Sequence, residues 1–534
     1  MRKMEKLVKI ILTVVLVLIA AACEKEAPVT EVPDIDGGDV SGAETVGHDL
    51  IVLGDKLEDP YSVKNVTKAL EALYPTKAGR VDITPTDKYV RFLPDGDDQY
   101  QRLVSMGLEL VDHPLDYKIV KDGDYYHDPA LDTTEITWQY AVVPYTFKMP
   151  SWVRGEVLDE CYIPDAAATR VGGIDWDAVE REAFRLTGNA DLLEPRTKGR
   201  DSPEGRITIV DEDANGGKPF GVAGVTVVAN VFVKFTKDHT DRDGYYKMKR
   251  SFSARPRYRL LFDNSASFDI GINKILIPAS TSTLGKGSNA GIDYTVTKES
   301  GRKIFSRCVV NNAAYDYISK CGDDGIGVLA PPRKLRIWIF QKMDASSAVM
   351  LHHGAVLDND LLTSFLGGYS QLIKVFAPDI TIGVSGKDDY ASIYAETCHE
   401  LAHASHFAQV GRSYWDKYIA YVIQSFITTG GETYGNGGDS GAGYCEVGEI
   451  WAYFMQSWFY NQRYGGAWPQ NGYSFWFHPQ ILRFLNQRGL SPGQIFKALD
   501  KDANSLGALK NKLLELYPEK SSVITQTFAR YETV

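Results

Sequence analysis

The order of hydrophobic and polar positions predicts different secondary structure in successive parts of the chain. After residue 49, a helix is expected at Val63–Tyr74, and strands are expected at runs rich in β-branched and aromatic residues, such as Lys88–Leu93 and Thr137–Val143. These elements predict a mixed α+β domain at residues 49–197. Its aromatic residues are interpreted as core, because nothing around them indicates a chemistry.

A strand-rich region follows a short linker. Residues 198–205 are polar and contain glycine and proline, and short apolar runs then occur at Arg206–Val210 and Gly221–Ala229. Together with the Thr240–Tyr246 turn, these runs resemble the first strands of the carboxypeptidase-regulatory-like, transthyretin-like β-sandwiches. The resemblance implies a β-sandwich at residues 206–292 that acts as a spacer or an interaction domain.

The Thr240–Tyr246 turn has the pattern T-D-x-D-G-x-Y, which allows two interpretations. In the transthyretin-like family this turn is structural: aspartate and glycine form the tight bend and the tyrosine enters the core. The alternative is that Asp241 and Asp243 bind calcium.

The last part of the chain, residues 300–534, is expected to be mostly helical with a small sheet. Strands are predicted at Arg333–Phe340 and Pro378–Val384, where β-branched residues gather, and an apolar helix follows the second strand. His352 and His353 lie between these strands in a predicted helix. Their side chains point to different faces, so they are interpreted as surface residues.

The apolar helix contains the segment His399-Glu400-Leu401-Ala402-His403, which has the pattern H-E-x-x-H. Histidines four residues apart lie one above the other on a helix face, so both imidazoles can bind one metal ion. Glu400 lies at the flank of the pair, where it can act as a general base on a water molecule. Because buried imidazoles need partners, a metal site is favoured over a structural helix with two solvated histidines.

A catalytic zinc ion takes three protein ligands and leaves one position for water, so a third ligand is required. His406 lies two helical turns after His399, roughly 10 Å along the axis, and cannot complete the site. The longer metzincin pattern is excluded, because its glycine position holds His406 and its last histidine position holds Gln409. This leaves a glutamate on a second helix, predicted from Tyr444 to about Tyr460.

Glu446 and Glu449 lie at the start of that second helix. Here the chain resembles the gluzincin metallopeptidases, in which the glutamate ligand is followed three residues later by a small residue. Glu449 matches this pattern with Ala452, which implies that Glu449 is the third ligand, and Glu446 is kept as the alternative. The separation of His403 from Glu449, 449 − 403 = 46 positions, is similar to that of the lethal-factor-like gluzincins. The resemblance covers roughly the last 150 to 200 residues.

Residues 428–444, between the two helices, include many glycines, so a mobile loop is expected near the site. Gluzincins commonly use a tyrosine or a histidine to stabilise the oxyanion of the reaction. The resemblance implies this role for Tyr434 or Tyr444, whereas the alternative is that both tyrosines are packing residues.

The first residues have the features of a bacterial secretion signal. Four basic residues precede an apolar run from Ile10 to Ala22 that is too short to span a membrane. The end of this run, Ala20-Ala21-Ala22-Cys23, resembles a lipobox, which implies a signal peptide at residues 1–22 and a lipid on Cys23. Residues 23–48 are expected to form a tether, because they have no apolar period and are rich in glycine, proline and acidic residues.

These features predict an outer-membrane lipoprotein, located at the cell surface or in the periplasm. Glu24-Lys25-Glu26 resembles the acidic signals that send some Gram-negative lipoproteins to the cell surface. The net charge of −11 argues against a nucleic-acid partner.

Five cysteines remain besides Cys23, an odd number. Cys308 and Cys321 are close enough in sequence to form a disulfide. Cys398 and Cys445 each adjoin a candidate ligand residue, so a disulfide between the two ligand helices is one expectation and free buried thiols are the other.

Together these observations predict a lipid-anchored zinc metallopeptidase of the gluzincin type that cleaves peptide bonds of extracellular proteins or glycoproteins. His399, His403 and Glu449 would bind Zn²⁺, and Glu400 would deprotonate the attacking water and later protonate the leaving amine. The alternative is a catalytically silent surface lipoprotein that keeps the zincin fold and acts in binding or adhesion.

Overall fold

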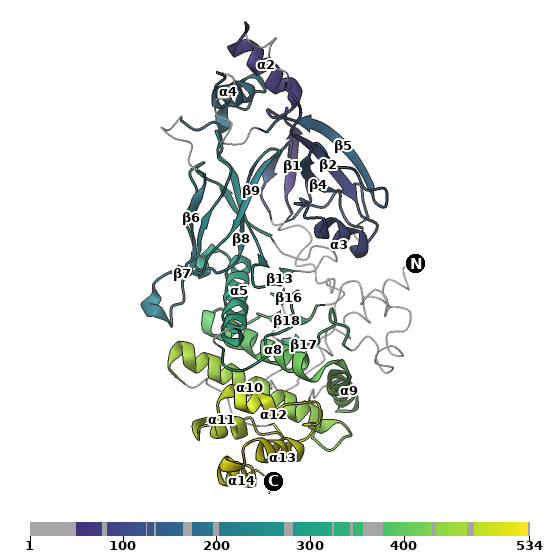
Figure 1. The fold of residues 1–534 in the computed structure, drawn as a ribbon, viewed down its shortest axis with the longest axis vertical. Coiled ribbons are helices and arrows are strands. Elements are labelled where there is room, and N and C mark those ends of the chain that lie inside the picture. Colours follow the sequence, from purple (N-terminus) through teal and green to yellow (C-terminus); the bar gives the residue numbers. More distant parts are fainter. Residues whose placement is uncertain are drawn as a thin grey trace.

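The computed structural model shows an elongated α+β protein whose sheets and helices are stacked along one long axis (Figure 1). The expected α+β class is confirmed by the five sheets and the helices of the described residues. The expected signal peptide, Cys23 and the tether lie outside the described residues. The structure describes residues 50–76, 83–123, 125–132, 135–163, 173–195, 202–271, 281–322, 325–341, 345–355, 378–429, 434–466 and 475–531.

The first part of the described chain combines two small sheets with three helices. Its elements are β1 (Val52–Lys56), α2 (Val63–Leu73), β2 (Asp87–Leu93), α3 (Asp97–Ser105), β3 (Tyr117–Lys121), β4 (Gln139–Pro144), β5 (Arg154–Cys161) and α4 (Trp176–Leu186). β1 pairs with β3, and β2 lies between β4 and β5. The predicted helix and both predicted strands are thus confirmed as α2, β2 and β4. Val66 and Ala69 of α2 pack with Val179 and Ala183 of α4 in a small separate core.

The middle part is a β-module of two sheets. Its strands are β6 (Glu204–Ile209), β7 (Phe220–Gly221), β8 (Thr226–Val231), β9 (Lys234–His239), β10 (Tyr245–Lys247), β11 (Arg257–Leu261), β14 (Thr281–Lys286) and β15 (Tyr294–Val296). One sheet has the order β10-β6-β15, with β7 paired to β6, and the other has the order β14-β11-β8-β9. Ile207, Val227, Tyr258 and Leu260 are fully buried in the core between them. β6 and β8 lie where strands were predicted.

In the Thr240–Tyr246 turn, the side chain of the first aspartate forms hydrogen bonds within the turn itself. Oδ1 of Asp241 accepts hydrogen bonds from the backbone N–H groups of Asp243 (2.9 Å) and Tyr245 (2.8 Å). Gly244 has a φ of 77°, and a Cβ at this position would collide with the backbone of β6, so glycine is required here. The final tyrosine of the turn is fully buried. These contacts favour the structural interpretation of the turn over calcium binding.

Two strands within residues 206–292 belong to a different sheet from the one expected. This sheet has the order β12 (Asp263–Asn264), β13 (Phe268–Gly271), β16 (Leu335–Phe340), β18 (Ile380–Gly383) and β17 (Ser347–Ala348). β13, β16 and β18 are parallel, whereas β17 is antiparallel and lies at the edge. A short apolar run predicts a strand but not its partner, because pairing depends on residues distant in sequence. β16 and β18 confirm the two strands predicted before the H-E-x-x-H helix.

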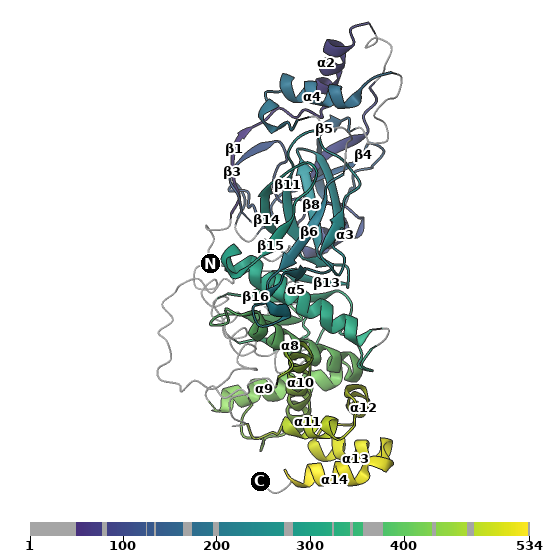
Figure 2. The same ribbon diagram turned by 90° about the vertical axis from the view of Figure 1, so that its left-hand side faces the viewer.

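The last part of the chain is mostly helical and lies beyond this sheet, at the end of the molecule opposite α2 and α4 (Figures 1 and 2). Its helices are α5 (Arg302–Cys321), α8 (Tyr390–Val410), α9 (Arg412–Thr429), α10 (Ala442–Tyr464), α11 (Gln480–Gln487), α12 (Pro492–Ala498), α13 (Leu506–Leu516) and α14 (Ser521–Ala529). α8 packs against β18, α5 and α10. The Asp389 side chain caps α8 by accepting from the Ser392 N–H (2.7 Å). Among the described helices, none is long and apolar enough to cross a membrane.

A buried ion pair ties the β-module to α10. Oδ2 of Asp211, which follows β6, accepts hydrogen bonds from Arg463 Nη2 and from the Tyr464 hydroxyl, both at 2.8 Å. The Asp211 side chain is fully buried. The Arg463 guanidinium also lies over the rings of Tyr390 (4.6 Å) and Phe220 (4.8 Å). From α10, one arginine therefore contacts both the β-module and α8.

The expected disulfide between Cys308 and Cys321 is wrong. Both residues lie on α5, and their separation of 321 − 308 = 13 positions corresponds to roughly 20 Å along a helix. All five described cysteines are free thiols, so Cys398 and Cys445 do not join the two ligand helices either. For that second pair, the alternative of free buried thiols is confirmed.

The helix expected around His352 and His353 is absent from the described part of that segment, where residues 351–355 form a turn. Nδ1 of His353 lies 2.9 Å from Oδ1 of the buried Asp379, at the start of β18. Nε2 of His353 lies 3.1 Å from the carbonyl oxygen of Arg333. This histidine therefore ties the turn to the sheet.

Candidate metal centre

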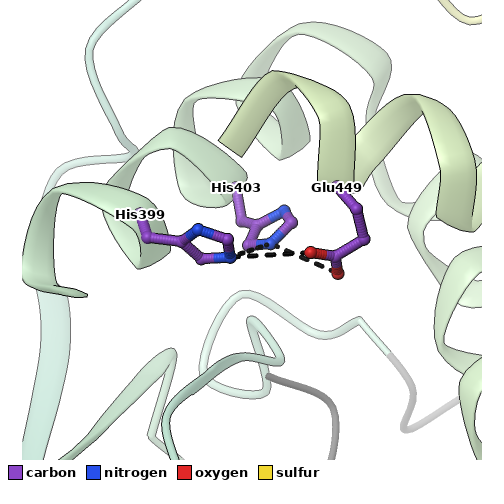
Figure 3. A group of neighbouring side chains, drawn as sticks. All are labelled: His399, His403 and Glu449. Carbon is purple, nitrogen blue, oxygen red and sulfur yellow. Dashed lines mark hydrogen bonds and ion pairs between the residues drawn. The ribbon is translucent and has the colours of Figure 1, made fainter. Parts of the chain in front are cut away.

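Three buried side chains from two helices converge on one point (Figure 3). α8 carries His399 and His403 one turn apart, and α10 carries Glu449. Nε2 of His399 lies 3.2 Å from Nε2 of His403, and each Nε2 lies 3.5 Å from one oxygen of Glu449. The ligand atoms all lie within 4.8 Å of one another, so the three residues could hold one metal ion.

The two helices approach closely because small residues lie at their contact. Ala402 of α8 and Ala452 of α10 are fully buried. Nε1 of Trp451 donates a hydrogen bond to the carbonyl oxygen of Ala402 (3.1 Å). This bond fixes α10 against α8 at the level of the histidine pair.

The three converging side chains influence one another's ionisation. Burial lowers the pKa of His399, but its hydrogen bond with Glu449 and the charge of Glu400 outweigh burial, so this pKa is raised. For His403 burial prevails over the attraction of Glu449, and the pKa is lowered. Burial raises the pKa of Glu449, yet the two histidines hold it below its usual range. The group therefore contains an ionised carboxylate and a neutral imidazole, the forms in which both residue types bind metals.

Two tyrosine hydroxyls donate hydrogen bonds to the carboxylate of Glu449. The hydroxyl of Tyr418, on α9, lies 2.5 Å from Oε1, and that of Tyr434 lies 3.4 Å from Oε2. Tyr434 was one of the two tyrosines predicted to lie at the site, and the structure brings it there. Tyr418 was not predicted.

Trp415 connects this centre to the edge strand of the sheet. Its ring stacks on Tyr418 with a centroid distance of 4.7 Å and lies 5.7 Å from the ring of His403. Its Nε1 donates to the carbonyl oxygen of Ala348 on β17 (3.1 Å). The aromatic residues of α9 recur three or four positions apart, which indicates a buried helix face. This spacing does not identify what the face contacts.

Glu400 lies beside the converging group without belonging to it. The residue is fully buried, and its charge contributes to the raised pKa of His399. The three groups that converge are those of His399, His403 and Glu449. A carboxylate next to a metal site, but not needed as a ligand, is placed for proton transfer.

Two other predicted residues lie away from the centre. Burial raises the pKa of Glu446 to about 7. A hydrogen bond with the backbone of Leu506, at the start of α13, partly offsets this rise in pKa. Glu446 therefore faces α13 and not the histidine pair. The hydroxyl of Tyr444 accepts a hydrogen bond from Lys417 Nζ (3.1 Å), and its ring packs on Tyr414 at 4.6 Å. These contacts favour the packing interpretation for Tyr444.

His406 is fully buried on α8 but lies outside the converging group, as its spacing from His399 predicted. Its ring packs against Tyr414 (5.2 Å) and Trp415 (5.8 Å). Burial lowers the pKa of His406 to about 3, so the imidazole is neutral. It is a core residue.

Aromatic rings form one wall of the centre. The ring of Tyr453 lies 4.6 Å from that of His399 and 5.3 Å from that of Phe475. Phe475 stacks on Phe477 at 4.8 Å, and both rings meet the edge of Tyr434. The wall shields the charged group from water, which strengthens electrostatic interactions inside it.

Comparisons of the chain with protein-family models, with curated proteins and with solved structures found no match. The chemistry of the site therefore carries the functional interpretation. Two imidazoles, one carboxylate and an adjacent buried glutamate form a set of groups suited to binding a divalent metal and moving a proton beside it.

Proposed function

We propose that the protein is a zinc-dependent peptidase of the gluzincin type. The observation that supports this most strongly is the convergence of His399, His403 and Glu449 with Glu400 beside them. Helices α8 and α10 lie in contact through small residues, in the manner implied by the resemblance to gluzincins.

The residues present fit zinc. Imidazole nitrogens and carboxylate oxygens are common zinc ligands, and three protein ligands leave a fourth tetrahedral position for water or substrate. When bound, a zinc ion would lower the pKa of water and polarise the scissile carbonyl group. The hydroxyl of Tyr418 lies 2.5 Å from Glu449 Oε1 and would orient this ligand, as hydrogen-bonding neighbours of metal ligands usually do.

The chain's own residues supply the proton transfers. Glu400 would take a proton from the attacking water, whose oxygen forms a bond to the carbonyl carbon. As the C–N bond breaks, Glu400 would pass this proton to the leaving amine. The hydroxyl of Tyr434 would turn from its long hydrogen bond with Glu449 and donate to the negative charge that develops on the carbonyl oxygen.

The edge strand β17 would align the substrate. It is antiparallel to β18 and has no neighbouring strand on its other side among the described residues. An extended peptide can add to such an edge through backbone hydrogen bonds. Trp415, which bonds to Ala348 of β17 and packs on His403, places this edge beside the metal ligands.

The proposed cellular location of the enzyme rests on the predicted lipoprotein signal at the N-terminus. A lipid on Cys23 would anchor the protein in the outer membrane, and residues 23–48 would hold the folded part away from it. Substrates would then be extracellular or periplasmic proteins and glycoproteins.

Metal analysis combined with one substitution tests the proposal. The intact protein, purified without chelators, is expected to contain one zinc ion per chain and to cleave members of a broad peptide library. Glu400→Gln is expected to keep the zinc and to lose cleavage at least about a hundred-fold, because it cannot accept the proton. Glu446→Gln, which alters a glutamate facing α13, is the matched control and is expected to retain cleavage.

The outcomes separate the two functional hypotheses. A protein that cannot be loaded with stoichiometric zinc would contradict the metal site itself. Stoichiometric zinc without cleavage of any peptide would favour the alternative, a catalytically silent surface protein that acts in binding or adhesion.

A further inference from the structure

The outer face of one sheet of the β-module carries two buried arginines. Arg257 and Arg259 alternate on β11 with Tyr258 and Leu260, which enter the core on the other face. Only 7% of Arg257 and 8% of Arg259 are exposed. Because the two arginines are two residues apart on one strand, their side chains leave the same face about 7 Å apart.

The N-terminal part of the chain covers this face with carboxylates that already have partners. The segment around β3 contributes three acidic residues: Asp122, which pairs with Arg257; Asp112, which hydrogen-bonds His113; and Glu109, which pairs with Lys237. Asp122 also accepts a hydrogen bond from Thr283 Oγ1 on β14 (2.9 Å). The seam between the two parts is therefore built from opposite charges.

Arg259 lacks an equivalent carboxylate. Its Nη2 donates a long hydrogen bond to Asn230 Oδ1 (3.4 Å), and no residue in the described part of the chain forms an ion pair with it. Nε of Arg259 and Nη1 of Arg257 are buried, and no described group accepts a hydrogen bond from either atom. Leaving charged donors buried without acceptors destabilises a folded protein, so two such atoms on neighbouring side chains of one strand face indicate a missing acceptor.

Arg257 lies close enough to affect the ionisation of Arg259. Burial and the charge of Arg257 outweigh the attraction of nearby carboxylates and lower the pKa of Arg259 to about 10, so its guanidinium stays charged at neutral pH. Burial, together with the charges of Arg259 and Arg257, also lowers the pKa of the neighbouring His113. Arg259 is therefore a buried cation with acidic residues nearby but with no described carboxylate in direct contact with it.

We infer that a small oxyanion binds between Arg257 and Arg259, at the seam between the N-terminal part and the β-module. A phosphate, sulfate or carboxylate group has several acceptor atoms, so one such group can bond to both guanidiniums. Because both arginines are more than nine-tenths buried, the site accepts a free ion or the terminal group of a larger molecule. Binding there would stabilise the docking of the two parts.

Thermal unfolding of the intact protein tests this site. In Tris buffer at an ionic strength fixed with chloride, inorganic phosphate and sulfate are expected to raise the unfolding midpoint in a saturable manner. Arg259→Met, which keeps the apolar stem, is expected to weaken binding at least ten-fold, measured by isothermal titration calorimetry. Arg206→Met, which removes an exposed arginine from the other sheet, is the control and is expected to bind like the unchanged protein.

A second variant keeps the test decisive if Arg259→Met does not fold. Asn230→Asp places a carboxylate where Arg259 already donates, so it is expected to raise the midpoint without added anion and to reduce the response to phosphate. A phosphate response equal to that of chloride, or one unchanged in these variants, would overturn the proposal. Binding of N-acetylglucosamine 6-sulfate tests whether the oxyanion is a free ion or the end of a larger molecule. If this compound binds more tightly than free sulfate, the site is assigned to a larger molecule. If it binds more weakly, the site is assigned to the free ion.

Discussion

At the scale of single residues, the carboxylate of Glu449 on α10 is held by groups from two other helices, α8 and α9. The histidines of α8 lie 3.5 Å from its oxygens, and the hydroxyl of Tyr418 on α9 lies 2.5 Å from Oε1. Tyr418 is itself fixed by stacking on Trp415. A ligand oriented in this way loses little freedom when it binds a metal, which favours tight binding.

Tyr418→Phe is therefore expected to weaken zinc binding by about ten- to a hundred-fold, because it removes the hydroxyl and leaves the ring. Competition with a chromophoric chelator measures the zinc dissociation constant. Tyr414→Phe is the matched control: its hydroxyl bonds to the carbonyl oxygen of Ala503 instead. Equal zinc affinity in the Tyr418→Phe and control proteins would show that the hydroxyl does not orient Glu449.

Asp59 gives stability a dependence on pH. Burial raises the pKa of this carboxyl to about 7, although the N–H of Tyr61 donates to Oδ1 (2.9 Å). Between the unfolded pKa near 4 and the folded pKa, the folded state holds one more proton than the unfolded state. The contribution of Asp59 to stability is therefore full at pH 4, falls as the pH rises and is lost above pH 7.

Asp59→Asn removes this titration and keeps an acceptor for Tyr61. The variant is expected to match the unchanged protein near pH 4 and to exceed its free energy of unfolding by roughly 2 to 4 kcal/mol at pH 8. Urea denaturation at both pH values measures the difference. A gain that is the same at both pH values would contradict the assignment to Asp59.

The residues of the site that lie on one helix could be predicted from the sequence, whereas contacts between different helices could not. His399, Glu400 and His403 are fixed relative to one another by helical spacing, and Glu449 was identified by its small neighbour Ala452. Tyr418 was missed because its contact with Glu449 depends on how α9 packs against α10, which no local pattern records. The same reason explains why Glu446, three positions from Glu449, could not be assigned from sequence to the face toward α13.

At the scale of elements, Gly448 of α10 has no side chain, and this allows α9 to approach the metal centre. A Cβ at Gly448 would lie 3.3 Å from the Tyr418 ring and 4.0 Å from the His403 ring. Tyr418 is buried between Trp415 and Glu449 and has little room to move. Gly448 therefore sets the distance between the two helices.

Two glycine-to-alanine substitutions test this role. Gly507→Ala lies on α13 with no atom within 4 Å of the added Cβ, so it is expected to raise stability by about 0.5 to 1 kcal/mol. Gly448→Ala is expected to show no such gain and to weaken zinc binding, because Tyr418 must shift. Thermal unfolding and zinc titration measure the two effects. Stabilisation by both substitutions with unchanged zinc affinity would contradict the proposed spacing.

The positions of helices and strands were more predictable than the pairing of the strands into sheets. α2, β16, β18 and the two ligand helices lie where hydrophobic patterns indicated, because periodicity is a local property. The assignment of β13 to the sheet of β16 was not foreseen. Phe268 and Ile270 of β13 are buried whichever sheet they join, and their alternation is the same in either.

At the scale of the whole molecule, the β-module and the helical part share one continuous hydrophobic core, and the Asp211–Arg463 pair is buried where they meet. Asp211→Ala would leave the Arg463 guanidinium without its carboxylate, so the free energy of unfolding is expected to fall by about 3 to 5 kcal/mol. Glu212→Ala, which removes the exposed partner of Lys298, is the matched control and is expected to change it by less than about 1 kcal/mol. Denaturant unfolding measures both.

The result for Asp211→Ala also reports how the parts cooperate. Loss of the pair is expected to lower the midpoint of one shared unfolding transition, because the two parts share a continuous hydrophobic core. A single, unshifted transition would show that the pair does not hold the parts together.

The hydrogen bond from Trp451 to Ala402 holds α8 and α10 in place with protein atoms alone. A site preformed by protein atoms selects an ion by ligand type and geometry, and imidazole ligands suit nickel, iron and copper ions as well as zinc. Which metal the protein carries would then be decided by the supply of ions where it folds. Copies made in different growth media could differ in activity although their sequences and folds are the same.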